Sequence, residues 1–191
     1  MTCRIASSHG RRFAVAAVSV VVLSTSAGRA QDVTESSLKA AFVYNFAKFT
    51  EWPADVLSPT ATFAACVLGD SPTRDALDRI VKGRQLSGRT ISVSEVQLGV
   101  GLRSCHLLYM SGVTKTQITA IVAAVRGVPV LTISDTDDFA RGGGIAQMFV
   151  ENGKIRFDIN LDVAKESRLQ LSSKLLALAA HLRGGPGAQG W

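Results

Sequence analysis

Histidine is scarce in this chain, and the motifs that usually carry catalysis are missing with it. The 191 residues include three histidines, and there is no G-x-S-x-G elbow, no H-E-x-x-H and no C-x-x-C. A zinc site would need Cys66, Cys105 and His106, but neighbouring strand residues point to opposite faces. The sequence therefore favours a binding protein over an enzyme. We expect no cofactor or metal, and we expect His106 to be a hydrogen-bonded core residue.

Long apolar runs are also few. Residues 13–23 (FAVAAVSVVVL) form one uncharged stretch, and as a helix it would span roughly 16 Å, about half a bilayer core. Arginines precede it and small residues follow it, with Ala30 and Gln31 flanking the expected cleavage position. This arrangement is typical of a cleaved signal peptide over residues 1–30, with a membrane anchor as the alternative. No later stretch is long enough to span a membrane, so we expect a periplasmic protein without direct membrane insertion.

The excess of basic residues belongs largely to the predicted leader. The chain has 21 Lys and Arg against 15 Asp and Glu, and the leader removes four arginines and no acid, which leaves +2. No basic cluster remains, so we expect no nucleic acid as a partner. Residues 31–183 suffice for one domain. Residues 184–191 have no periodicity, which predicts a disordered tail.

Cysteine is limited to Cys66 and Cys105 once Cys3 leaves with the leader. In an oxidising compartment two cysteines favour one disulfide. Closing a loop of this length would stabilise the fold by roughly 4 kcal/mol. Two buried, unpaired thiols in strands are the alternative.

Apolar periodicity predicts helices that alternate with strands. Residues 32–35 resemble a capping box, and a helix follows that should end near Trp52, because Pro53 disfavours helix in the residue before it. The stripe that should face the core consists of Leu38, Ala41, Phe42, Asn45, Phe46 and Phe49. The elements predicted next are a strand at 63–68, a helix at 71–82, strands at 88–96 and 105–110, a helix at 114–126 and a strand at 128–134.

The last third of the chain departs from this alternation. Residues 145–151 and 154–160 flank Asn152-Gly153, the strongest short hairpin signal. Residues 161–183 then read as helical pieces. The predicted fold is an α/β, compact single-domain sandwich with a mainly parallel sheet flanked by helices and a C-terminal antiparallel hairpin.

Three further segments have polar or glycine-rich patterns. Gly69, Asp70 and Ser71 lie where a strand end meets a helix N-terminus, the place where open α/β sheets bind ligands, although a plain helix cap gives the same pattern. Residues 135–138 (DTDD) favour capping of a new helix, with a cation site as the alternative. Residues 142–144 (GGG) favour a turn into a strand over a phosphate cradle.

Several segments together resemble one family. Residues 40–53 (AAFVYNFAKFTEWP), an aromatic helix that runs into Trp-Pro, are similar to the opening signature of the YfiR family. Matching segments follow in the family's order: 66–70 (CVLGD), 105–109 (CHLLY), 130–135 (VLTISD), Phe139, 142–145 (GGGI), 156–160 (RFDIN) and 171–176 (LSSKLL). The resemblance covers residues 38 to about 180. No single segment is diagnostic, but the ordered set is specific.

The resemblance implies a function that the residues alone do not reach. It implies a periplasmic, non-enzymatic regulator that binds the periplasmic sensor region of an inner-membrane diguanylate cyclase and represses it, lowering cyclic-di-GMP and biofilm formation. It also implies a homodimer and a Cys66–Cys105 disulfide, since the family carries cysteines at both motif positions. Some members have a second cysteine pair near the glycine turn. Redox control through such a bond is not implied here, because residues 140–149 contain no cysteine.

Aromatic and arginine side chains are the usual anchors of protein interfaces, and two elements supply candidates. Tyr44 lies outside the aromatic stripe of the first helix, which favours exposure, whereas Phe49 belongs to the stripe. Trp52 precedes Pro53 and could instead close the end of the sheet. Arg156 and Asp158 alternate with apolar residues and so should face away from the core. The candidates for partner binding are Tyr44, Phe49, Trp52, Arg156, Asp158 and Asn160. The alternative function is a periplasmic small-ligand-binding protein that uses residues 69–73 and feeds a transporter or a sensor kinase.

Overall fold

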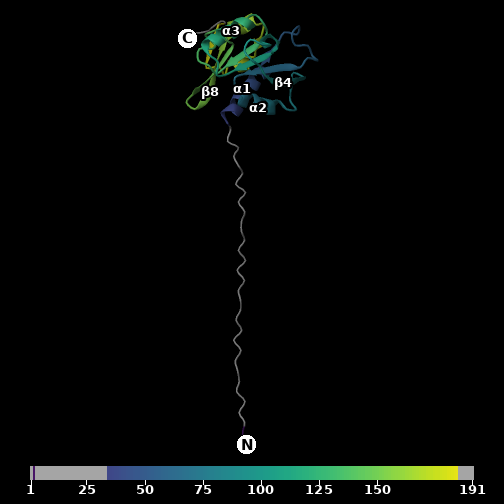
Figure 1. The fold of residues 1–191 in the computed structure, drawn as a ribbon, viewed down its shortest axis with the longest axis vertical. Helices are drawn as coiled ribbons and strands as arrows, with labels where there is room; N and C mark the ends of the chain where they lie inside the picture. The colour runs from purple at the N-terminus through teal and green to yellow at the C-terminus, as the bar shows by residue number, and fades with distance from the viewer. Residues whose placement is uncertain (1, 3–33, 185–191) are drawn as a thin grey trace. The chain divides into compact units, whose positions relative to one another are not determined.

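The computed structural model describes Thr2 and residues 34–184 (Figure 1). The predicted cleavage position between Ala30 and Gln31 and the tail from residue 185 lie outside the described residues, as does the predicted helix start at Asp32. The N-cap of α1 (Glu35–Lys48) is Thr34, whose hydroxyl oxygen accepts a hydrogen bond from the backbone N–H of Ser37 at 3.2 Å. The capping residue therefore lies two positions later than predicted.

An eight-stranded sheet forms the centre of the described domain, in the order β10-β8-β7-β6-β5-β2-β4-β3. Neighbouring strands from β4 to β7 run parallel, as do β8 and β10, whereas β7 and β8 form an antiparallel hairpin and β3 pairs antiparallel with β4. The mainly parallel sheet and the hairpin confirm the predicted α/β fold. The strands are β2 (Phe63–Leu68), β3 (Gln85–Leu86), β4 (Arg89–Glu95), β5 (Leu107–Met110), β6 (Leu131–Ser134), β7 (Ala146–Glu151), β8 (Lys154–Asn160) and β10 (His181–Arg183).

Helices cover both faces of this sheet. Figure 1 shows α3 (Lys115–Val125) above the strands and α1 and α2 (Ser71–Val81) below them. The alternation along β2 explains the two cores: Phe63 and Val67 pack with α1 and α2, whereas Cys66 packs with the residues under α3. The short helix η1 (Leu102–Ser104) joins this second core through Leu102.

The buried face of α1 differs from the predicted stripe. Ala40, Val43, Phe46 and Ala47 are buried, while Asn45 is exposed. α1 packs on α2 as well as on the sheet, and its small alanines allow this close approach. Two phenylalanines of the predicted stripe do contact the sheet: the rings of Phe42 and Phe46 both meet the ring of Phe157 edge-on.

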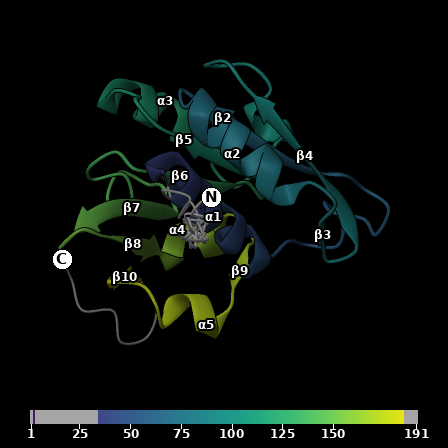
Figure 2. The same ribbon diagram turned by 90° about the horizontal axis from the view of Figure 1, so that it is seen from below.

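Short strands replace two predicted helical segments. α1 ends at Lys48, not near Trp52, and β1 (Thr50–Glu51) pairs with β9 (Gln170–Leu171). After α4 (Leu161–Glu166) the backbone of Arg168 adopts a positive φ of 59°, which ends the helix. α5 (Ser173–Leu176) has four residues, and β10 follows it alongside β8 (Figure 2). The prediction of helix over residues 161–183 was therefore only partly right.

Candidate functional site

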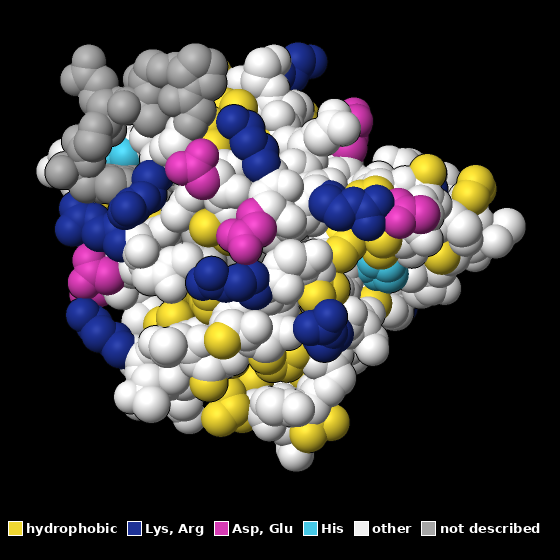
Figure 3. Space-filling model, turned by 90° about the horizontal axis from the view of Figure 1, so that it is seen from above, with side chains coloured by type: hydrophobic (Ala, Val, Ile, Leu, Met, Phe, Trp, Pro, Cys, Tyr) yellow, Lys and Arg dark blue, Asp and Glu magenta, His cyan; other side chains and the backbone are white. Residues whose placement is uncertain are grey.

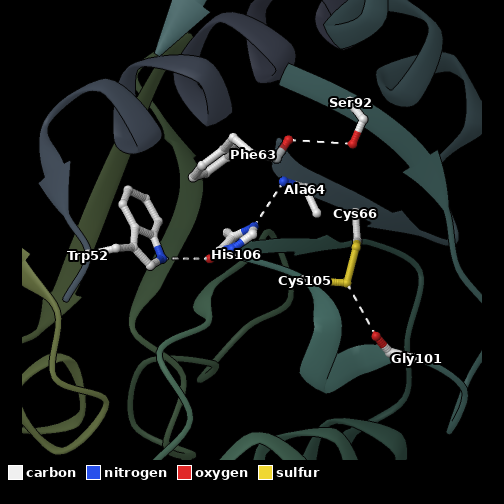
Figure 4. The surroundings of a disulfide bond; sticks show 8 residues. All are labelled: Trp52, Phe63, Ala64, Cys66, Ser92, Gly101, Cys105 and His106. Atoms are coloured by element: carbon white, nitrogen blue, oxygen red, sulfur yellow. Dashed lines mark hydrogen bonds between the residues drawn. A yellow bond between two sulfur atoms is a disulfide. The ribbon is translucent and has the colours of Figure 1, made fainter. Parts of the chain in front are cut away.

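The disulfide joins β2 to the short segment between η1 and β5. Cys66 lies in β2, and Cys105 follows η1 just before β5. Their Cα atoms are 5.9 Å apart, a separation that suits a disulfide. The Sγ atom of Cys105 also lies 3.6 Å from the carbonyl oxygen of Gly101 (Figure 4). The bond closes a 39-residue separation that includes α2, β3 and β4.

Trp52 lies against the amino ends of three strands. Its indole N–H donates to the carbonyl oxygens of His106 and Pro129, each at 3.1 Å. Its ring meets that of Phe63 edge-on, with the centroids 4.9 Å apart. These contacts place Trp52 where β2, β5 and β6 begin, so that it closes one end of the sheet; Figure 4 shows its position relative to His106 and Phe63.

His106 completes the same contact set. Its Nδ1 atom accepts a hydrogen bond from the backbone N–H of Ala64 at 2.9 Å, and its ring stacks on Phe63 with the centroids 5.3 Å apart. Burial lowers the pKa of His106 below its usual value, and the charge of Arg89 lowers it further. His106 is therefore held in its neutral form, the form that can accept the hydrogen bond from Ala64. The expectation of a hydrogen-bonded histidine is confirmed.

Trp52 also lines a surface hollow. About 430 Å³ of space lies beside the end of the β1–β9 pair, lined by Glu51, Trp52, Pro53, Lys165, Arg168, Leu169 and Gln170. One nitrogen of Arg168 lies 2.7 Å from a carboxylate oxygen of Asp55. An aromatic ring and an arginine thus border one hollow, the combination typical of a protein interface.

The other predicted partner-binding residues do not form one patch with Trp52. Tyr44 is half-buried, and the guanidinium of Arg84 from beyond α2 lies 5.5 Å from the centre of its ring. Phe49 is half-buried against the main core. Arg156 is exposed and forms an ion pair with Glu151 at 3.3 Å. Tyr44 and Phe49 belong to one helix and its end, whereas Arg156 belongs to the hairpin.

Asp158 was predicted to face away from the core and to be exposed, but it is buried, and so is the candidate residue Asn160. Their side of the strand is covered, and the two residues are only 7% and 4% exposed. Asp158 Oδ1 lies 2.8 Å from His181 Nδ1 on β10. The side chain of Asn160 donates to Ala140 O at 2.8 Å and caps α4. Alternation shows correctly that both residues face away from Phe157, but it says nothing about what covers that face.

The turn after β2 lies at the topological switch point of the sheet. From β2 the chain moves to β4 on one side and then to β5 on the other, which is where open α/β sheets form a ligand crevice. Gly69 has φ of 80°, and a Cβ atom there would collide with the carbonyl oxygen of Ser111. Asp70 caps α2 through Thr73, whose N–H and hydroxyl donate to its carboxylate at 2.9 and 2.7 Å. Ser71 donates to Glu95 at 3.0 Å.

The structure adds neighbours to Asp70 that the sequence reasoning missed. The Tyr109 hydroxyl lies 3.3 Å from Asp70 Oδ2 and 3.2 Å from Asp135 Oδ2. Asp135 also accepts hydrogen bonds from Ser111 at 2.9 Å and from Lys39 at 2.7 Å. Ser111 and Asp135 directly follow β5 and β6, and Asp70 lies two residues after β2. The rule that parallel strands end at one edge could therefore have grouped them. Nothing in the sequence pattern pointed to Lys39.

The prediction that residues 135–138 cap a new helix was wrong. Turns and no helix follow Asp135 in residues 136–144. Burial raises the pKa of Tyr109 far above its usual value, and the charges of Asp135 and Asp70 add to the rise. Tyr109 therefore stays protonated and can donate. Desolvation alone would lower the pKa of Lys39, but its bonds to Asp135 and Glu35 outweigh this and raise it.

The chemistry available at this network is positioning. Its polar groups bind one another, with the hydroxyls of Tyr109 and Ser111 and the ammonium of Lys39 all directed at the carboxylate of Asp135. A hollow of about 270 Å³ adjoins the network, lined by Glu35, Lys39, Asp135, Asp137, Met148, Phe149, Val150 and Ile155. Within residues 34–184 and Thr2, no three His, Cys, Asp or Glu side chains are grouped to hold a metal ion.

Two properties of the whole domain complete the description. None of the helices in the described part of the chain is long and apolar enough to cross a membrane. On the face that Figure 3 shows, Lys and Arg side chains are interspersed with Asp and Glu. That face therefore presents no large region of one charge.

Two of the solved structures that resemble this chain show the extent of the likeness. A conserved domain protein from Vibrio cholerae is 11% identical, with 78% of this chain and 60% of that chain covered at a TM-score of 0.46. An ABC domain in complex with L-Trp from Streptococcus pneumonia is also 11% identical, with 68% of this chain and 57% of that chain covered at a TM-score of 0.47. The chain thus spans about three fifths of the length of each.

A family comparison covers most of the chain. The YfiR/HmsC-like profile matches residues 36–180, from the start of α1 to the residue before β10. The match includes both cysteines, Trp52 and the network around Asp135. The chain belongs to the YfiR/HmsC-like family.

Proposed function

We propose that this protein is a periplasmic, non-enzymatic regulator that binds the periplasmic sensor region of an inner-membrane diguanylate cyclase and represses it. The observation that carries the proposal is the family match over residues 36–180. Resemblance to this family implies such a partner. The outcome of binding would be lower cyclic-di-GMP.

The mutual engagement of the polar groups around Asp135 supports a binding role. Asp70, Tyr109 and Asp135 are engaged with one another and with Lys39, so they are held as a structural unit. The Cys66–Cys105 disulfide supports a location outside the cytoplasm, because disulfides persist in oxidising compartments. The predicted signal peptide points to the same compartment.

We place the partner-binding surface at the hollow beside Trp52. Trp52 and Arg168 border it, and Glu51 and Lys165 supply both charges at its rim. Phe49 packs against the main core and does not line this hollow. Asp158 and Asn160 are buried, and their side chains bind His181 and Ala140 within the domain, so we leave them out of this surface. Tyr44 and Arg156 lie apart and would contact only a partner that covers more than this hollow.

Repression without chemistry requires a difference in affinity. A protein that binds the inactive conformation of the cyclase more tightly shifts the equilibrium towards it. A shift from mostly active to mostly inactive needs a differential affinity of about 5 kcal/mol. A few buried aromatic and arginine anchors can supply energies of that size.

Cellular cyclic-di-GMP tests the proposal. Deleting the gene should raise its level, and the wild-type gene should restore it. Trp52→Ala should restore it poorly, whereas Leu178→Ala, an exposed apolar control at 67% exposure, should restore it fully. Unchanged cyclic-di-GMP in the deletion strain would contradict the function. Full restoration by Trp52→Ala would contradict the surface.

Small-ligand binding is the second candidate, and the position of Asp70 favours it. The turn Gly69–Ser71 ends at the switch point, close to the hollow of about 270 Å³ beside Asp135. A ligand held there would link the protein to a transporter or a sensor kinase. A thermal-shift screen with periplasmic metabolites separates the candidates. A rise in melting temperature with one metabolite, abolished by Asp137→Ala, would favour this second function.

A further inference from the structure

The β7–β8 hairpin continues past its neighbour β6. The last pair between β6 and β7 joins Ser134 to Gln147, whereas β7 runs on to Glu151. In the described part of the chain, no other strand lies beside this end of β7 on the β6 side. Figure 1 shows the hairpin reaching beyond the neighbouring strands, near the amino end of α1. The hollow of about 270 Å³ opens at this fork, because the hairpin lines it on one side and Asp135 and Asp137 line it on the other.

The hairpin gives the hollow an apolar wall. Met148, Val150 and Ile155 belong to its lining, and the register places Val150 opposite Ile155. Val150 is 68% exposed, although it is an apolar residue in a strand. A ligand that covered this surface would gain free energy by the hydrophobic effect. The wall therefore favours a ligand with a hydrocarbon body.

The backbone of Val150 adds a hydrogen-bond acceptor to this wall. The N–H of Asn160 donates to the carbonyl oxygen of Ile145 at 2.8 Å, so the odd-numbered residues from 145 to 151 turn their backbone groups toward β8. The backbone groups of Val150 turn the other way, past the end of β6, and among the described residues no hydrogen bond ends on them. A carbonyl oxygen is thus open to a donor at the edge of the apolar wall.

The opposite wall carries negative charge. Lys39 is the one cation among the described residues of the lining, and it pairs with Glu35 and Asp135 at 2.7 Å each. The carboxylate of Asp137 is exposed and has no ion pair with any side chain that the structure describes. Three carboxylates and one ammonium give the lining a charge of −2. An anion would therefore be repelled here, whereas a cation would meet the open carboxylate of Asp137.

We propose that this hollow binds a small organic ammonium ion, a protonated amine of net positive charge on a hydrocarbon body. Its N–H groups donate to the carboxylate of Asp137 and to the carbonyl oxygen of Val150, while its hydrocarbon covers Met148 and Ile155. The hollow is slightly smaller than those that hold drug-sized molecules, so the ligand is a small amine. The proposal rests on the second candidate function, small-ligand binding, and does not depend on repression of the cyclase.

Backbone amide chemical shifts of the full, processed protein test the ligand class. n-Hexylammonium should shift the amide signals of Val150 and Ile155, whereas hexanoate, a chain of the same length with the opposite charge, should shift neither. Each buried methylene is worth about fourfold in affinity, so ethylammonium should bind at least tenfold more weakly than hexylammonium. Equal binding of the three probes would overturn the proposal, and so would the absence of shifts with hexylammonium.

Matched variants test the site. Asp137→Asn keeps the shape of the side chain and removes its charge, so it should weaken hexylammonium binding about threefold or more. Val150→Ser should also weaken it, because the apolar wall shrinks. Glu51→Gln removes an exposed carboxylate from the hollow beside Trp52 and should leave the affinity unchanged. Equal affinities of the wild type, Asp137→Asn and Val150→Ser would overturn the site.

A titration with anionic metabolites separates this proposal from the function on which it rests. If an anion shifts the amides of Val150 and Ile155 and hexylammonium does not, the ammonium class is wrong and small-ligand binding stands. If hexylammonium shifts them and Asp137→Asn weakens the response, the proposal is supported whether or not a metabolite screen yields a ligand.

Discussion

The Nζ atom of Lys39 lies 2.7 Å from Oδ2 of Asp135, so one ion pair joins α1 to the end of β6. The two side chains are only 17% and 18% exposed. The same carboxylate oxygen accepts hydrogen bonds from Tyr109 and Ser111 at the end of β5. One carboxylate therefore holds a helix and two strand ends together.

Replacing Asp135 with asparagine should destabilise the fold. Lys39 loses its charged partner, and the hydroxyls of Tyr109 and Ser111 lose a charged acceptor. We expect the free energy of unfolding in urea to fall by about 1–3 kcal/mol. Asp137→Asn, two residues away and exposed, should change it by less than about 0.5 kcal/mol. Equal effects of the two substitutions would contradict the role of Asp135.

Acid should weaken the fold through His106. Its pKa in the folded protein lies below the usual value because of burial, so the unfolded chain takes up the proton first. The stabilising contribution is complete above pH about 6.5 and is lost as pH falls through the folded pKa. His106→Asn keeps an acceptor for the N–H of Ala64 but does not titrate.

Urea unfolding from pH 7.5 to pH 4.5 measures this difference. The wild type should lose stability relative to His106→Asn below pH about 6.5, by up to about 1.4 kcal/mol per pH unit. Parallel curves for the two proteins would show that His106 does not carry the effect.

Gly69 should be far less tolerant of a side chain than Gly83. Both have a positive φ, 80° and 73°, so alanine strains the backbone at either position by about 1 kcal/mol. Only at Gly69 does the added Cβ also collide with Ser111 O, whereas nothing lies near Gly83. Thermal melts should show a markedly larger loss for Gly69→Ala than for Gly83→Ala. Similar losses would mean that the contact with Ser111 relaxes freely.

Removing the disulfide should cost about 4 kcal/mol, because it closes a 39-residue separation in the unfolded chain. The double variant Cys66→Ala and Cys105→Ala should unfold at correspondingly lower urea concentration. Reduction of the wild type should reproduce the effect. An unchanged midpoint would show that the bond does not restrain the unfolded state.

The sequence predicted the central strands well for physical reasons. Residues 63–68 are a short apolar run, and Asn152-Gly153 selects a tight hairpin turn. β9 and β10 escaped prediction because strands of two and three residues have no measurable period. They form only because β1 and β8 offer edges beside them.

The candidate site was predicted in part. The turn at Gly69–Ser71 was identified from its place between a strand and a helix, and it does lie at the switch point. The partners Tyr109, Asp135 and Lys39 come from three separate elements. Their meeting depends on strand order and helix position, which periodicity does not encode. The burial of Asp158 was missed for the same reason, because its cover comes from β10.

The activity of the membrane cyclase itself tests the central claim most directly. Inner-membrane vesicles that carry the cyclase, with its periplasmic region accessible, would be mixed with the purified processed protein, and formation of cyclic-di-GMP from GTP would be followed. We expect activity to fall as the protein approaches one copy per sensor region, and we expect Trp52→Ala to need at least tenfold more protein for the same fall. Full cyclase activity at saturating wild-type protein would contradict the proposed function.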